Sequence, residues 1–157
     1  MPPASANAES PAIPAAILAI DLGNARIGLA RSTALGTAEP LFTMRRTSPR
    51  ADAKSIARTA RKHNCALILV GHPVHLSGDA SPQSLKAQQF AAALAAVTPI
   101  PVQLFDERLT TVAAHEQLDA AGHARDRKTR DRIIDQVAAV ILLETFLQHQ
   151  RLNPPRS

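Results

Sequence analysis

The sequence predicts an α/β protein with a mixed five-stranded sheet, its first three strands antiparallel, flanked by about four helices. Three observations predict this class. Short apolar runs of strand length alternate with segments of helical periodicity. A tight turn joins the first two apolar runs. A Ser-Pro pair, which is a common helix start, precedes two of the helical segments.

The first three predicted strands form a meander. The apolar run at residues 16–20 ends at Asp21 and predicts a buried central strand. A turn at residues 24–26 leads into a second apolar run that ends near Arg31, so these two strands form a hairpin. Residues 35–44 add a third antiparallel strand.

The rest of the chain predicts helices that alternate with two further strands. Residues 65–70 form a nearly continuous apolar run, typical of a parallel strand covered on both faces, and residues 99–105 form the last strand. Right-handed crossovers then extend the hairpin into a sheet with helices packed on it. The predicted helices begin at Pro49, Pro82, Thr110 or Thr111, and about Thr129.

Composition bounds the domain organisation and the setting of the protein. The 157 residues suit one domain, which we place at residues 15–150, between a disordered leader at 1–14 and a flexible tail at 151–157. Cys65 is the only cysteine, which excludes an internal disulfide and favours a reduced, cytoplasmic setting. No apolar run reaches the length of a membrane span, so no membrane partner is expected.

The charge of the chain points to a polyanionic partner. A formal net charge of +5 and a pI of about 10.3 favour nucleic acid, although a surface that is basic only for solubility is the alternative. Trp and Tyr are absent, so recognition would depend on backbone charge and not on stacked bases. The densest basic stretch, which also reads as a salt-paired surface loop, precedes the last helix. The candidate phosphate-binding residues are Arg26, Arg108, Arg125, Arg127, Lys128, Arg130 and Arg132.

Three acids occupy the ends of predicted elements. Asp21 ends the first strand, Glu107 follows the last strand, and Asp135 borders the buried stripe of the last helix. Three converging carboxylates cannot all stay ionised without a cation, and oxygen ligands suit Mg²⁺ or Mn²⁺. Two such ions can activate water and stabilise the leaving oxygen of a phosphodiester. Each acid taken alone has a simpler interpretation as a turn cap or ion-pair partner, and spacing does not decide between them.

Two histidines lie in the predicted loop after the fourth strand. His72 and His75 flank the turn at residues 73–74, and no third metal ligand is suggested nearby. We expect them to form hydrogen bonds in this loop or to contact a substrate.

Four motifs in the same order resemble the YqgF family, whose members are also called Holliday junction resolvases or pre-16S ribosomal RNA nucleases. The resemblance runs from about residue 16 to 148. It rests on residues 19–23 with 26–30, on 70–73, on 106–111, and on Asp135 with 138–142.

The resemblance implies a ribonuclease H-like fold. It implies a metal-dependent acidic site at Asp21, Glu107 and Asp135, the positions that their placement in the chain also indicates. It further implies trimming of the 5′ end of precursor 16S ribosomal RNA in the bacterial cytoplasm, on free RNA or on a ribosomal particle. His72 and His75 depart from the Leu and Asn that are common in the family, and this bears on substrate contacts.

Three other functions stay open. One is a Holliday junction resolvase on branched DNA, which would act as a homodimer and not as a monomer. Another is a non-catalytic nucleic-acid-binding factor in transcription or ribosome assembly. The last is an ATPase or kinase, because an acid and a glycine in a hairpin also open the phosphate-binding domains of actin-like and sugar kinases. Those enzymes need two such domains, and this chain is long enough for one.

Overall fold

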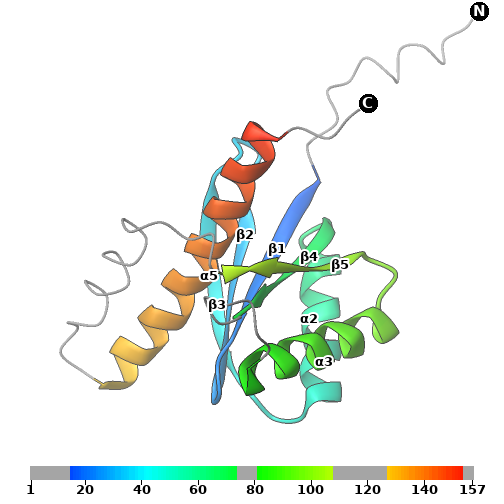
Figure 1. The fold of residues 1–157 in the computed structure, drawn as a ribbon, viewed down its shortest axis with the longest axis vertical. Helices are drawn as coiled ribbons and strands as arrows, with labels where there is room; N and C mark the ends of the chain where they lie inside the picture. The colour runs from blue at the N-terminus through cyan, green and yellow to red at the C-terminus, as the bar shows by residue number, and fades with distance from the viewer. Residues whose placement is uncertain (1–14, 74–80, 108–126, 154–157) are drawn as a thin grey trace, which may run out of the picture.

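The computed structural model describes residues 15–73, 81–107 and 127–153, with side chains in the last segment described from residue 134. These residues form five strands and three helices (Figure 1). The elements are β1 (Ala16–Leu22), β2 (Arg26–Ser32), β3 (Ala38–Arg45), α2 (Pro49–Lys62), β4 (Cys65–His72), α3 (Pro82–Val97), β5 (Val102–Asp106) and α5 (Arg127–Leu152).

The strands form one mixed sheet in the order β3-β2-β1-β4-β5. The pairs β1–β2 and β2–β3 are antiparallel, while β1–β4 and β4–β5 are parallel. This arrangement confirms the predicted sheet, with β1 at its centre. Among the described residues there are three helices, fewer than the four expected, because the helix predicted from Thr110 or Thr111 lies outside them.

Helices cover both faces of the sheet (Figure 1). On one face, Leu18 and Ile20 of β1 pack with Ile56 of α2 and Phe90 of α3. On the other face, α5 packs over a second cluster of buried residues. This second cluster consists of Ala19, Ala30, Leu69, Phe105, Ala139, Leu142, Leu143 and Phe146. Two of its four sheet residues, Ala19 and Ala30, are small, which lets α5 lie close to β1 and β2.

The helix starts predicted at Pro49 and Pro82 are confirmed by their caps, whereas the last helix begins at Arg127, two residues before the predicted Thr129. Ser48 accepts a hydrogen bond from the backbone N–H of Ala51 at the start of α2. Ser81 and Ser84 form a reciprocal capping box at the start of α3. Within the described part of the chain, no helix is long and apolar enough to span a membrane.

The third strand begins later than predicted. It starts at Ala38 and not at residue 35, because the preceding residues form the turn of the β2–β3 hairpin. The Thr33 carbonyl accepts from the Gly36 N–H, and Gly36 has a φ of 79°, which favours glycine. Near the C-terminus of the chain, α5 continues to Leu152, two residues beyond the domain end predicted at residue 150.

Candidate active site

Asp21 is held on the α5 face of the sheet by the pleat of β1. Side chains alternate between the two faces of a strand, and Ala19 is buried in the cluster beneath α5. Asp21 is partly buried and stands directly opposite Gly28 of β2. Because Gly28 has no side chain, the space beside Asp21 on this face stays open to a neighbouring element.

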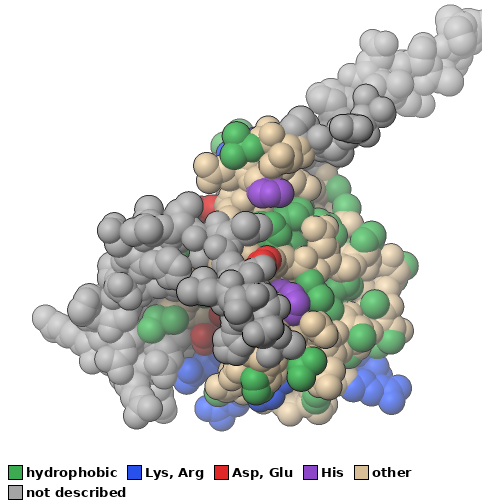
Figure 2. All heavy atoms as spheres, viewed as in Figure 1, with side chains coloured by type: hydrophobic (Ala, Val, Ile, Leu, Met, Phe, Trp, Pro, Cys, Tyr) green, Lys and Arg blue, Asp and Glu red, His purple; other side chains and the backbone are tan. Residues whose placement is uncertain are grey.

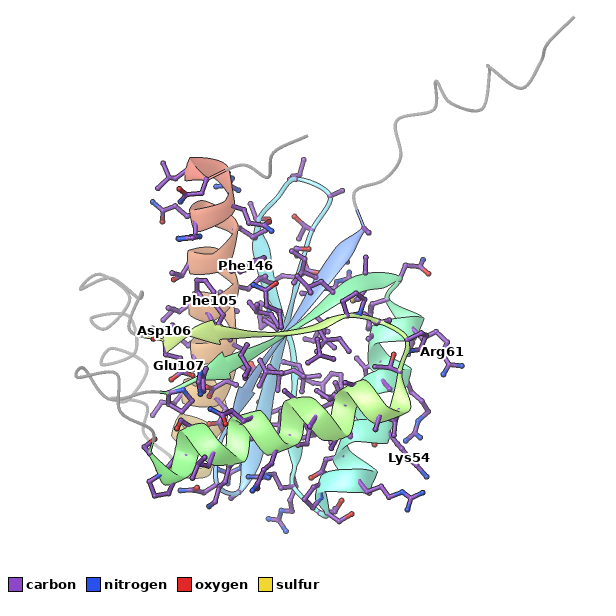
Figure 3. All side chains as sticks on the ribbon, turned by 45° about the vertical axis from the view of Figure 1, so that its right-hand side comes forward. Lys54, Arg61, Phe105, Asp106, Glu107 and Phe146 are labelled. Carbon is purple, nitrogen blue, oxygen red and sulfur yellow. The ribbon has the colours of Figure 1, made fainter. Side chains whose placement is uncertain are left out.

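Glu107 lies one residue beyond β5, on the same face as Phe105. In Figure 3, Phe105 points toward Phe146 of α5, and their ring centroids are 5.3 Å apart. Glu107 lies over Gly71 of β4, since a Cβ atom built on this glycine would come within 2.5 Å of the Glu107 Oε1 atom and 3.3 Å of Leu142 in α5. The Glu107 carboxyl group is therefore inserted between β4 and α5.

Asp135 reaches the site from α5. A Cβ atom built on Gly28 would overlap the Asp135 carbonyl group, so the helix crosses β2 in direct backbone contact. A Cβ atom on Gly23, in the β1–β2 turn, would lie 3.6 Å from the Asp135 Oδ1 atom. Asp135 is thus brought to the end of β1, where Asp21 lies.

The charges of these acids are coupled. Burial first, and then the negative charges of Glu107 and Asp135, raise the pKa of Asp21 from 3.8 to about 7. Burial, followed by the charge of Asp106, raises the pKa of Glu107. The structure therefore brings the three predicted acids into one cluster, and their catalytic and metal-binding roles stay predictions.

The donor set of this cluster suits a hard divalent cation. All three groups are carboxylates, and the raised pKa of Asp21 reflects first its burial and then the negative charges of Glu107 and Asp135, which a cation would offset. In the described parts of the chain, no three His, Cys, Asp or Glu side chains are already arranged as a metal centre. Asp21, Glu107 and Asp135 could therefore hold Mg²⁺ or Mn²⁺ only by closing further around it.

The predicted basic residues are only partly described. Arg26 begins β2 and stands directly opposite Arg45 of β3. The backbone of residues 127–132 forms the start of α5, so this stretch leads along the helix toward Asp135. The side chains of Arg127, Lys128, Arg130 and Arg132, and the whole of Arg108 and Arg125, lie outside the described part.

The prediction that His72 belongs to a loop is wrong. His72 is the last residue of β4, where parallel pairing with β5 sets it beside Asp106. Its ring Nε2 lies 3.2 Å from the side-chain nitrogen of Gln88 in α3, on the face opposite α5. His72 is thus directed away from the acids because the preceding residue, Gly71, occupies their face. His75 lies outside the described residues.

Sequence reasoning missed the two glycines that make room for the acids. Gly28 and Gly71 lie within strands, where glycine is otherwise unfavourable and often marks a close approach of another backbone or a ligand. The presence of these glycines within strands was the feature of the sequence that could have revealed them. Their contacts with Asp135 and Glu107 became visible only in the folded chain.

The chain is similar to known proteins that are named as nucleases or resolvases. A family model described as "RuvX: Holliday junction resolvase" matches residues 15–149. A protein of Clavibacter michiganensis subsp. michiganensis named "Putative pre-16S rRNA nuclease" is 45% identical over 142 residues, which cover 88% of this chain and 87% of the relative. A protein of Chloroflexus aurantiacus with the same name is 39% identical, covering 90% of this chain and 92% of its own. These names support a hydrolase that acts on nucleic acid.

Solved structures agree with the fold. RuvC of T. thermophilus, in complex with a Holliday junction substrate, aligns with a TM-score of 0.56 at 12% identity over 88% of this chain and 96% of that chain. A second Thermus thermophilus RuvC structure aligns with a TM-score of 0.51 at 13% identity, over 87% and 96%. At such low identity the likeness shows the fold alone, and it confirms the ribonuclease H-like class.

Proposed function

Because the chain belongs to the RuvX family, also called YqgF, we propose that it is a metal-dependent endonuclease that matures the 5′ end of precursor 16S ribosomal RNA. The observation that carries this proposal is the meeting of Asp21, Glu107 and Asp135 at the end of the central strand. We infer the substrate from the names of the curated relatives. The protein would act in the cytoplasm, on RNA or on a ribosomal particle, as a monomer or homodimer.

The three carboxylates would hold Mg²⁺ or Mn²⁺ between the sheet and α5. A bound ion of this kind polarises a phosphodiester and lowers the pKa of water, which is the chemistry that hydrolysis requires. Asp21 is the cross-strand neighbour of Gly28, Asp135 lies over Gly28 from α5, and Glu107 lies over Gly71. The protein's part is to fix these oxygen donors at one edge of the sheet and to shield them beneath a helix.

Basic residues would orient the polyanion around this cluster. Arg26 lines a hollow together with Asp135, next to the β1–β2 turn. Positions 128 and 132 are about two turns and one turn before Asp135 in α5, a spacing that places them along one side of a helix. These two positions, together with Arg108, Arg125, Arg127 and Arg130, are proposed phosphate contacts.

The test is a cleavage assay with two labelled substrates, a 5′-extended 16S ribosomal RNA fragment and a four-way DNA junction, in Mg²⁺ or Mn²⁺. Asp21→Asn should lower RNA cleavage by more than the ~10–100-fold typical of losing an outer-shell partner of a metal ligand. Glu39→Gln is a matched control, because it makes the same chemical change in a residue of β3 that pairs with Arg31. The control variant should cleave like the wild type.

The family description and the RuvC-like fold favour one second candidate, a junction resolvase. Cleavage of the DNA junction alone would replace the RNA assignment with this one. A resolvase that cuts two strands symmetrically also needs a two-fold dimer, which light scattering detects. Binding of both substrates without cleavage of either would instead identify a non-catalytic nucleic-acid-binding factor.

A further inference from the structure

Three hollows follow one edge of the protein, and neighbouring hollows share wall residues. The first is lined by residues 23–26 and by Asp135 of α5. The second, of about 500 Å³, shares residues 24–26 and adds Arg45, Arg46 and the start of α2. The third shares Arg46 with the second and reaches Lys86 of α3. These three neighbouring hollows, here together called the basic groove, extend from Asp135 to α3.

The walls of the basic groove carry a concentration of positive charge. Arg26 and Arg45 stand directly opposite each other across β2 and β3. Like charges in that arrangement cost stability in a sheet, whereas together they attract an anion strongly. Lys86 is exposed at the far end, and Lys and Arg side chains gather along the lower margin of the face seen in Figure 2.

Arg46 is fixed in place at the centre of the groove. Its Nη1 atom donates a hydrogen bond to the Gly23 carbonyl oxygen at 2.9 Å, and its backbone N–H donates to the Ala25 carbonyl oxygen at 2.9 Å. A guanidinium group tied to the turn in this way loses less freedom when it binds a ligand than a free side chain does.

Asp52, the acidic residue in the wall of the second hollow, is held by hydrogen bonds from its own neighbours. Asp52 is 1% exposed, and its Oδ1 atom accepts from the Thr47 N–H at 3.1 Å and from the Thr47 hydroxyl at 2.9 Å. The Asp52 carboxylate is therefore engaged in tying the chain before α2 to the first turn of this helix.

We propose that the basic groove binds the sugar–phosphate backbone of an RNA strand next to the bond that is cut, through Arg45, Arg46 and Lys86. This inference deepens the proposed function and rests on it. Arg45 lies two strands away from Asp21 and two residues further along β3 than the position level with it. With ~4.8 Å between strands and ~3.3 Å per residue, the Cα atoms of Arg45 and Asp21 are about 12 Å apart. A phosphate held at this distance fixes the register of the strand and thereby which bond reaches the acids.

The test compares two double variants that each remove two positive charges. Arg45→Ala with Lys86→Ala removes two positive charges from the groove and leaves Arg26 and Arg46 in place, whereas Arg58→Ala with Arg61→Ala changes exposed residues toward the other end of α2 (Figure 3 labels Arg61). The probe is a fluorescein-labelled RNA hairpin with a 5′ single-stranded extension. Its affinity is measured by anisotropy from 50 to 300 mM salt in EDTA, so that nothing is cut.

The groove variant should bind about 10-fold more weakly, and the slope of log K against log salt should fall by about 1.4–1.8, as expected for two lost phosphate contacts. The α2 variant should keep the wild-type slope and bind within about 2-fold. Equal losses in both variants, or no loss in the groove variant, would overturn the proposal. Unchanged thermal melting of both variants excludes misfolding as the cause.

The two proposals fail in different ways. A wild type that binds the hairpin with the expected slope but cuts no substrate in Mg²⁺ or Mn²⁺ refutes the nuclease and supports the groove. A wild type that cuts RNA while both double variants bind alike refutes the groove and supports the nuclease. Groove-dependent binding of a four-way DNA junction without groove-dependent binding of RNA overturns the RNA assignment.

Discussion

The Asp135 carbonyl group lies against the α-carbon of Gly28 so closely that a Cβ atom there would overlap it. Gly28 is also the cross-strand partner of Asp21. One glycine therefore sets how near the helix acid comes to the strand acid. The contact depends on backbone atoms on both sides, which cannot rotate away as a side chain can.

The first prediction concerns Gly28→Ala. The added methyl group must push α5 off β2, because its obstacle is the backbone of Asp135. Overpacking of this kind costs about 1–3 kcal/mol, so the free energy of unfolding in urea should fall by about that amount and RNA cleavage should be lost. Wild-type cleavage by this variant would show that the spacing of Asp21 and Asp135 is not critical.

The second prediction concerns Gly71→Ala, the matched change on the other side of the cluster. Here the methyl group meets the Oε1 atom of Glu107, the far end of a flexible side chain, at 2.5 Å. The carboxyl group can turn aside and Leu142, at 3.3 Å, need shift only slightly, so the free energy of unfolding should fall by less than in Gly28→Ala, by about 1 kcal/mol, while cleavage falls at least ~10-fold. A large loss of stability with normal cleavage per folded molecule would contradict this contrast with Gly28→Ala.

The third prediction concerns pH. The pKa of Asp21 is about 7 in the folded chain against an ordinary 3.8, so the folded state binds more protons than the unfolded state between these values. In EDTA the free energy of unfolding should therefore fall as pH rises from about 4 to 7, and the raised pKa of Glu107 acts in the same direction.

Asp21→Asn should remove most of this pH dependence. At pH 8 in EDTA the variant should be more stable than the wild type by about 2 kcal/mol, a figure reduced from the full pKa shift because Asp21 is only partly buried. Near pH 4 the two proteins should be similarly stable. Urea unfolding at the two pH values measures both effects. Equal stability of the two proteins at pH 8 would mean that Asp21 is not strained by burial and its neighbours.

The fourth prediction concerns metal binding without reference to catalysis. A cation that binds only the folded protein with a Kd of about 1 mM should stabilise it by about 1.4 kcal/mol at 10 mM. The melting temperature at pH 8 should thus increase when Mg²⁺ or Mn²⁺ is added to the wild type or to the Glu39→Gln variant. The rise should disappear in Asp135→Asn, and an equal rise in all three proteins would place the ion elsewhere.

The sequence by itself determined the local elements and the identity of the acids. Apolar runs of strand length and the Ser-Pro starts are short-range signals, because caps and side-chain periodicity act within a few residues. They therefore located β1, β2, β4 and the starts of α2 and α3 closely, whereas β3 and β5 begin three residues later than predicted. The placement of Asp21 and Glu107 at strand ends followed from the same pattern.

Only the tertiary structure decided which face each residue occupies and what it meets there. A shift of one residue moves a strand side chain to the other face, so His72 points to α3 while Glu107 lies over its neighbour Gly71. The contact of Gly28 with Asp135, and the basic groove that joins Arg46 to Lys86, bring together residues far apart in the chain. Such contacts depend on strand register and helix packing, which no local pattern encodes.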